Sequence, residues 1–137
     1  MSLSDQVREL VRDIPDFPKP GIVFRDITPV TRNPDALEGI CRWIADLARD
    51  RNATTIAGIE SRGFLFAAGA AVHCGLGVTL IRKAGKLPWK TVSESYALEY
   101  GEATMEVHED AFSKEDRVLV VDDLLATGGT AEAACRL

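Results

Sequence analysis

The sequence has no excess of basic residues. Lysine and arginine together number 16 against 21 aspartate and glutamate residues, which gives a net charge of −5 at pH 7. A protein that follows a nucleic-acid backbone needs clustered positive charge on one face or along one helix. No such basic stripe runs through the 137 residues, so nucleic acid is not expected as a partner.

Cysteine is scarce, with three residues at Cys41, Cys74 and Cys135. Their odd number and wide spacing match neither a disulfide framework nor a set of metal ligands. All three lie in apolar stretches with helical character, where cysteine usually packs as a small hydrophobic residue. The sequence therefore predicts a reducing, cytoplasmic location.

Long apolar runs are also missing. Charged residues interrupt the amino-terminal segment, so it has no apolar core of a secretion signal. The longest apolar stretch, residues 64–81, contains Gly75 and Gly77 and is bounded by Arg62 and Arg82. The two glycines divide it into a helix and a strand, so a membrane span is not expected.

What the sequence does contain predicts a single α/β domain over residues 1–137. Apolar spacing indicates a first helix from Leu3 that ends before Pro15, and a second helix that begins after an Asn33 cap. A short apolar strand is expected at 22–24. Further along, strands and a small-residue helix alternate as in βαβ units, with the strands at 55–59, 78–81 and 118–121 and the helix at 63–74.

A polar loop over residues 82–94 interrupts this alternation. Two strand-like runs, 95–100 and 103–108, follow it and are joined around Gly101 as a hairpin. The loop is too long and too charged for a simple connection, which favours a functional flap. The sequence stops at Leu137, one or two turns into a helix that begins near Gly129, so we expect a fragment whose carboxyl-terminal part is missing.

The most informative run covers residues 118–130. Four apolar residues predict a buried strand, Asp122 and Asp123 follow it, and a loop of small residues leads into a helix. Backbone N–H groups of such a loop can approach a phosphate closely. Adjacent carboxylates can accept hydrogen bonds from two vicinal ribose hydroxyls. The run predicts a ribose-phosphate site; alone, an Asp pair would more often end a strand and cap a helix.

A second loop, residues 59–63, lies between a strand and a helix. In a parallel sheet, ligands bind beyond the carboxyl ends of the strands. The start of the helix and the Arg62 guanidinium would suit an anion there. An alternative makes Ser61 a nucleophile, but a glycine two residues before it is missing and only His73 or His108 could act as its base.

The run at 118–130 resembles the phosphoribosyl-pyrophosphate signature of the type I phosphoribosyltransferases, and residues 124–130 resemble the form that acts on adenine. Four other segments agree with that form, and the resemblance extends from about Val7 to the last residue. They are Phe17–Pro29 (FPKPGIVFRDITP), Gly58–Phe64 (GIESRGF), Leu80–Pro88 (LIRKAGKLP) and Tyr96–Gly101 (YALEYG).

The resemblance implies an open, mostly parallel sheet flanked by helices, with a hood at about 15–31 and a flexible β-hairpin flap at about 82–108. It implies purine salvage, in which ribose 5-phosphate passes from phosphoribosyl pyrophosphate to N9 of adenine and gives AMP and pyrophosphate. Mg²⁺ would be carried mainly by the substrate, because the sequence has no dedicated metal cage. The family is commonly homodimeric.

The resemblance also implies roles for individual residues. Asp122 and Asp123 would bind the ribose and, with Glu99 handling a proton at the purine, form the catalytic set. Ala126 stands where enzymes acting on 6-oxopurines carry an acid, which favours adenine. The 5-phosphate would contact Ala126, Thr127, Gly128, Gly129 and Thr130; pyrophosphate would contact Ser61, Arg62, Gly63, Arg82, Lys83 and Lys86; and adenine would contact Val23, Phe24 and Arg25.

Two other functions stay open at the level of the sequence. One is a non-catalytic regulator that binds phosphoribosyl pyrophosphate in the same site, although such regulators usually carry an added DNA-binding segment. The other is an inactive fragment of the enzyme. For several residues the ordinary structural role also stays open: Phe24 as a core residue, Glu99 as an outward strand residue, and the charges near residue 82 as a solvated loop.

Overall fold

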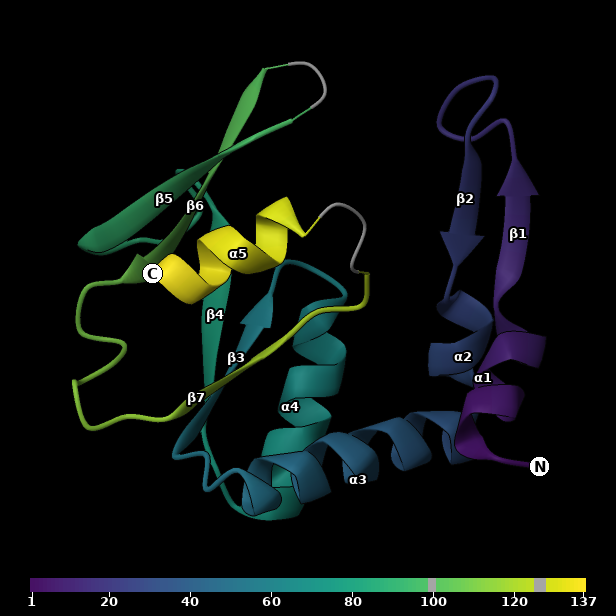
Figure 1. The fold of residues 1–137 in the computed structure, drawn as a ribbon, viewed down its shortest axis with the longest axis horizontal. Coiled ribbons are helices and arrows are strands. Elements are labelled where there is room, and N and C mark those ends of the chain that lie inside the picture. The colour runs from purple at the N-terminus through teal and green to yellow at the C-terminus, as the bar shows by residue number, and fades with distance from the viewer. Residues whose placement is uncertain (99–100, 125–127) are drawn as a thin grey trace.

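A computed structural model describes residues 1–98, 101–124 and 128–137 (Figure 1). The first helix, α1 (Leu3–Leu10), begins with a capping box in which Ser2 and Asp5 bond to each other's backbone N–H groups. It ends four residues earlier than the sequence predicts. Residues Arg12–Pro15 instead form strand β1, because the position before a proline disfavours helical backbone and Ile14 pairs across to Phe24.

Strand β1 pairs antiparallel with β2 (Val23–Asp26), and together they form a small two-stranded sheet. An ion pair between Arg12 and Asp26 (3.2 Å) joins the two strands. Two helices follow, the short α2 (Thr28–Arg32) and the long α3 (Pro34–Asp50), whose first turn is capped by the predicted Asn33. Figure 1 shows the β1–β2 hairpin standing apart from the main sheet, beyond the amino-terminal end of α3.

The main sheet has five strands in the order β5-β6-β4-β3-β7. Its centre is parallel: β3 (Thr55–Ile59) lies between β4 (Val78–Lys83) and β7 (Val118–Val121). An antiparallel hairpin, β5 (Thr91–Ala97) and β6 (Glu102–His108), extends the sheet on the β4 side. The α/β class is confirmed, and the sheet is mixed because this hairpin joins its parallel core.

The predicted loop at 82–94 is shorter in the structure. Strand β4 continues to Lys83 and β5 begins at Thr91, so the connection covers residues 84–90. Cross-strand polar contacts explain the extra length of the strands. The Glu106 carboxylate accepts hydrogen bonds from the Gly85 N–H (2.8 Å) and from the Thr91 hydroxyl (2.7 Å).

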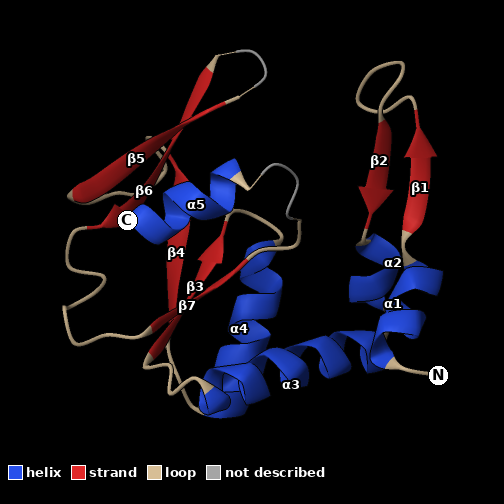
Figure 2. Cartoon of the chain, viewed as in Figure 1, coloured by secondary structure: helices blue, strands red, loops and turns tan. Residues whose placement is uncertain are grey.

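Helices cover both faces of the sheet (Figure 2). Helices α3 and α4 (Gly63–Cys74) pack on one face through a cluster of buried residues: Ile44, Ala45, Ala48, Ile56, Phe66, Ala67, Ala70, Ala71 and Val121. Helix α5 (Gly129–Arg136) packs on the other face through a second buried cluster: Ala57, Ile59, Ile81, Met105, Ala133 and Ala134. Because Ala57 and Ile59 face α5 while Ile56 faces α4, strand β3 is buried on both sides, as expected for a parallel strand.

The three cysteines lie in helices and are free thiols. Cys41 is buried as predicted and packs tightly under α4, where a Cβ on Gly69 would come 2.3 Å from its Sγ. Cys135, by contrast, is exposed because it lies on the outer side of α5. Within the described residues, no helix has both the length and the apolar character needed to cross a membrane.

Candidate active site

A cavity of about 340 Å³ lies at the carboxyl-terminal edge of the three parallel strands. Residues at or directly after the ends of these strands, the start of α5 and the β5–β6 hairpin form its wall. The lining residues are Ile59, Glu60, Ser61, Arg62, Ile81, Arg82, Lys83, Tyr96, Met105, Asp122, Asp123, Leu124, Gly128, Thr130 and Ala131. The cavity therefore brings together two loops that are sixty residues apart in the sequence, as the switch-point rule for parallel sheets predicts.

Asp122 and Asp123 follow β7 and enter this cavity side by side. Burial and, less strongly, the neighbouring Asp123 carboxylate together raise the pKa of Asp122 to about 6, although the Asp123 N–H donates a hydrogen bond to Asp122 (2.8 Å) that opposes this shift. Asp123 accepts a hydrogen bond from Arg62 Nε at 2.5 Å. In this pair, Asp122 has a raised pKa and Asp123 forms an ion pair with Arg62.

This arrangement predicts a stability that depends on pH. In the folded protein the Asp122 pKa is about 6 against an ordinary 3.8, so between these values the folded chain holds a proton that the unfolded chain has lost. The stability that Asp122 contributes therefore falls as pH rises from about 4 to about 6. Above that range, the loss of stability caused by ionising this buried carboxyl group is complete. Asp122→Asn removes this loss of stability, so the free energy of unfolding should rise by about 1 kcal/mol at pH 7 after allowance for solvent screening.

Thermal melts of Asp122→Asn and the unaltered protein at pH 4.5 and pH 7.5 check this expectation. The variant should melt at the higher temperature at pH 7.5, and the difference should shrink at pH 4.5. Asp116→Asn is the matched control, because hydrogen bonds from Ser113 and Thr54 lower the pKa of Asp116. Loss of the Asp116 carboxylate should reduce the stability at neutral pH, which is opposite to the change expected for Asp122→Asn. Equal behaviour of both variants would contradict the assignment for Asp122.

The loop between β3 and α4 carries a cis peptide bond between Glu60 and Ser61. Ser61 and Arg62 both line the cavity. Arg62 also lies over the Phe24 ring, 5.7 Å from its centroid, and Phe24 packs edge-on against Phe17 at 5.3 Å. Arg62 therefore connects the β1–β2 hairpin with the Asp123 carboxylate, a link that the sequence did not reveal.

Glu60 is a cavity residue that sequence reasoning missed. Its carboxylate accepts hydrogen bonds from Arg82 Nε (2.9 Å) and from the Lys83 N–H (3.3 Å). Partial burial opposes ionisation of Glu60, but these two bonds and the nearby positive charges outweigh it, so its pKa lies below the usual value. The signal was available: Ile59 pairs with Ile81 in parallel register, which places the following residues, Glu60 and Arg82, next to each other.

The structure describes the last residues of the small-residue loop before α5. Gly128 has a left-handed backbone (φ 88°), and α5 starts after it without a side-chain cap. Gly128 and Thr130 line the cavity, and Gly129 is the first residue of the helix. The helix amino terminus is thus directed to the space beside the Asp pair. The predicted contacts of Ala126 and Thr127, and the predicted role of Glu99, lie outside the described residues.

The remaining predicted residues do not belong to the cavity lining. Gly63 packs behind it, against the carbonyl of Val121, while Lys86 is in the turn after β4. Val23 is exposed and Arg25 forms an ion pair with Asp13, whereas Phe24 lies under the Arg62 guanidinium. Tyr96 and Met105 were missed because their positions depend on packing between distant elements, whereas Leu124 and Ala131 directly follow predicted residues in the sequence.

Neither histidine of the serine-nucleophile alternative belongs to this cavity. His73 is in the last turn of α4, at the end opposite Ser61, and His108 ends β6 beside Trp89. Ser61 thus lies among cations and carboxylates without an imidazole on the cavity wall. In the described part of the chain, no three His, Cys, Asp or Glu side chains gather in a way that could hold a metal ion.

Residues 26–137 match the family model of the phosphoribosyl transferase domain, which is the class that this sheet and its edge cavity define. The chain is 61% identical over 124 residues to an adenine phosphoribosyltransferase of Parafrankia sp. (strain EAN1pec), covering 90% of this chain and 67% of that protein. It therefore belongs to the adenine phosphoribosyltransferase family, as the signature segments predicted.

Solved structures agree with this assignment. The chain resembles the crystal structure of adenine phosphoribosyltransferase from Rhodothermus marinus, with 46% identity, a TM-score of 0.91, and coverage of 98% of this chain and 77% of that one. It also resembles the Saccharomyces cerevisiae enzyme complexed with an imino-altritol bisphosphate and adenine, with 36% identity, a TM-score of 0.90, and coverage of 98% and 79%. The fold expected from the resemblance is thereby confirmed.

Proposed function

We propose that this protein acts in purine salvage and transfers ribose 5-phosphate from phosphoribosyl pyrophosphate to N9 of adenine, giving AMP and pyrophosphate. One observation carries the proposal. A single cavity has an acidic pair and a helix amino terminus on one side and three cationic side chains, Arg62, Arg82 and Lys83, on the other. A donor that has a phosphate, two ribose hydroxyls and a diphosphate needs this combination.

The ribose and its 5-phosphate fit the β7–α5 side of the cavity. Asp122 and Asp123 would each accept a hydrogen bond from a ribose hydroxyl, and ionised acceptors make these bonds stronger than neutral ones. The start of α5, with Gly128, Gly129 and Thr130, would bind the phosphate through backbone N–H groups and the helix dipole. Ala126 and Thr127 complete this proposed contact set.

The diphosphate fits the β3–β4 side. Glu60 holds the Arg82 guanidinium in place, and Lys83 lines the wall beside it. Arg62 is bonded to Asp123, so ribose hydroxyls that bind Asp123 would compete with this guanidinium for the carboxylate. Binding of the donor would then leave Arg62 available to the diphosphate, together with Ser61, Gly63 and Lys86. Positioning and fixed charge would supply most of the catalysis.

In the transfer step, the bond from the anomeric carbon to the diphosphate oxygen breaks and the bond to N9 forms, with inversion at that carbon. The leaving diphosphate takes the electron pair, and the N9 proton passes to a base. We assign that base to Glu99. Phe24 would stack on the purine, with backbone groups of Val23 and Arg25 reading its edge, and Ala126 would favour adenine over 6-oxopurines.

Mg²⁺ fits this cavity as an ion that arrives with the donor. The lining carboxylates are Glu60, Asp122 and Asp123, and the first and last of them are bonded to arginines, so they do not form a closed cage. Mg²⁺ commonly keeps several waters and binds one or two carboxylates together with substrate phosphates. We propose that oxygens of the donor mainly hold the Mg²⁺ ion and that Asp122 and Asp123 would be its protein ligands. The ion would offset charge on the diphosphate.

Two further assignments belong to the proposal. The three free thiols suit a reducing cytoplasm. A homodimer would bury apolar side chains that one chain leaves exposed, among them Leu65 and Val72 on α4 and Leu80 on β4. Sedimentation of the purified protein would give its mass in solution.

The test of the proposed function is AMP formation from adenine, phosphoribosyl pyrophosphate and Mg²⁺, followed by chromatography. Hypoxanthine and guanine are assayed in parallel, and a thermal melt of the same sample shows that the chain is folded. We expect product from adenine only. A cooperatively folded chain that is stabilised by the donor but forms no AMP would contradict the enzyme and favour a regulator, and equal use of hypoxanthine would contradict the adenine assignment.

A further inference from the structure

Helix α5 connects two parts of the cavity wall that are far apart in the sequence. Its N-cap residue, Gly128, and its residues Thr130 and Ala131 line the cavity beside the Asp pair. Its eight residues span about 12 Å, and its last residue, Arg136, reaches the β5–β6 hairpin. That hairpin supplies Tyr96 and Met105 to the opposite wall.

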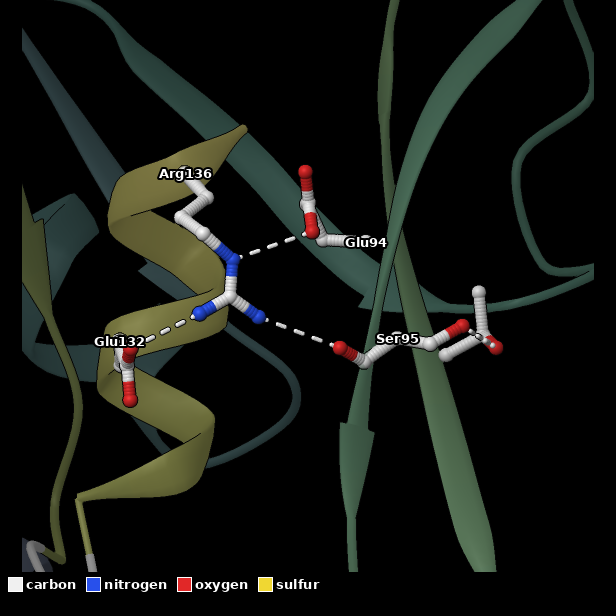
Figure 3. Close-up of polar contacts among 5 residues, drawn as sticks. Glu94, Ser95, Glu132 and Arg136 are labelled. Atoms are coloured by element: carbon white, nitrogen blue, oxygen red, sulfur yellow. Dashed lines mark hydrogen bonds and ion pairs between the residues drawn. The ribbon is translucent and has the colours of Figure 1, made fainter.

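The Arg136 guanidinium makes three contacts (Figure 3). Its Nε donates to the Glu94 carboxylate at 3.1 Å, and its Nη2 donates to the Ser95 carbonyl at 3.2 Å. Its Nη1 pairs with Glu132 on the same helix at 3.0 Å. The first two contacts form a planar fork onto consecutive residues of β5, a geometry that a guanidinium provides and an ammonium does not.

The position of these contacts links them to the cavity wall. Glu94 lies two residues before Tyr96 on β5, so both side chains are on the same face of the hairpin. Glu94 pairs with Met105 across the two strands, and the Ser95 hydroxyl bonds to the Thr104 hydroxyl at 2.9 Å. A displacement of Glu94 and Ser95 would therefore move Tyr96 and Met105 as well.

The apolar contact between α5 and the sheet is small. The buried helix residues are Ala133 and Ala134, whose side chains are single methyl groups. Such a surface permits sliding and rotation more easily than interlocking large side chains do. Among the described residues, the side-chain hydrogen bonds between the helix and the hairpin are those of the Arg136 fork.

We propose that Arg136 is a positioning residue, which fixes the β5–β6 hairpin relative to the α5 amino terminus so that phosphate binding at one end of the helix sets the hairpin wall at the other. This inference rests on the proposed function, because it requires a phosphoribosyl donor in the cavity. Arg136 does not touch the reacting atoms. Its effect is to hold Tyr96 and Met105 where they exclude water from the anomeric carbon.

The test compares the unaltered protein with Arg136→Gln, Glu94→Gln and the matched control Glu132→Gln. Glu132→Gln removes only the contact within the helix, on a side chain that is 73% exposed. We expect Arg136→Gln to lower kcat/KM for the donor about tenfold, with Glu94→Gln in the same direction and Glu132→Gln unchanged. The double variant at 94 and 136 should be no worse than Arg136→Gln, because the two side chains act as one contact.

A second readout separates positioning from a general loss of structure. Without adenine, water can attack the anomeric carbon as the bond to diphosphate breaks, which gives ribose 5-phosphate and pyrophosphate and releases a proton to solvent. Arg136→Gln should raise this hydrolysis relative to AMP formation several-fold, and Arg136→Lys should recover part of the ratio. Glu132→Gln should leave it unchanged.

The outcomes are distinguishable. No AMP from the folded, unaltered protein would reject the proposed function and this inference with it. AMP formation with equal kinetics and equal hydrolysis for Arg136→Gln and Glu132→Gln would overturn the inference alone. If Arg136→Gln does not fold cooperatively, Glu94→Gln decides, since it loses the Nε contact and leaves α5 intact; unchanged kinetics in that variant would then overturn the inference.

Discussion

Asp123→Asn is expected to lower kcat/KM for phosphoribosyl pyrophosphate by roughly 10- to 100-fold while the KM for adenine stays nearly constant. The Asp123 carboxylate lines the cavity and forms an ion pair with Arg62. A hydrogen bond to an ionised acceptor contributes about 1.5–3 kcal/mol, which corresponds to that range. The asparagine oxygen can still accept a ribose hydroxyl, but without charge, and Arg62 loses its partner.

Initial rates at varied donor and at varied adenine measure the two effects separately. Asp46→Asn is the matched control, because Asp46 also pairs with an arginine, Arg49 (2.9 Å), but lies on the exposed side of α3. It should behave as the unaltered protein does. A donor KM and kcat that stay unchanged in Asp123→Asn would remove the ribose assignment, whereas a parallel loss for adenine would show a general disturbance of the cavity.

Gly63→Ala is expected to disrupt the cavity although Gly63 does not line it. A Cβ at this position would come 2.7 Å from the Val121 carbonyl oxygen and 3.2 Å from the Asp122 Cα. Both atoms are backbone, so relief requires α4 to move away from β7. That movement would separate Ser61 and Arg62 from the Asp pair. Overpacking of this kind costs about 1–3 kcal/mol of stability, and a displacement near 1 Å in a catalytic site lowers activity by about 100-fold.

Denaturant unfolding and AMP formation check the two parts of this expectation. Gly77→Ala is the control, because a Cβ there has no heavy atom within 4 Å and its backbone does not require glycine. That variant should unfold at the same denaturant concentration or slightly higher, since alanine restricts the unfolded chain. A Gly63→Ala protein with unaltered stability and activity would show that α4 and β7 do not need the close approach seen in the structure.

The sequence predicted β3, α4 and β7 at the residues where the structure has them. These elements are short and strongly patterned, and glycines at positions 63 and 75 mark the helix boundaries. The first helix was predicted too long because Ile14 continues its apolar spacing, yet the same side chain gains a cross-strand partner in Phe24. The connection after β4 was likewise predicted too long, since its strand ends are held by Glu106, a residue about twenty positions away.

For the site, the sequence alone determined which groups lie at the end of each parallel strand: the Asp pair after β7, Ser61 and Arg62 after β3, and Arg82 and Lys83 at the end of β4. That inference holds because carboxyl ends of parallel strands meet at one edge. Only the tertiary structure decided how these groups pair: Arg62 with Asp123 and Phe24, Glu60 with Arg82, and Arg136 with the hairpin. Strand positions along the chain follow from local patterns, whereas strand order and ion-pair partners depend on distances between elements that the pattern of one chain does not encode.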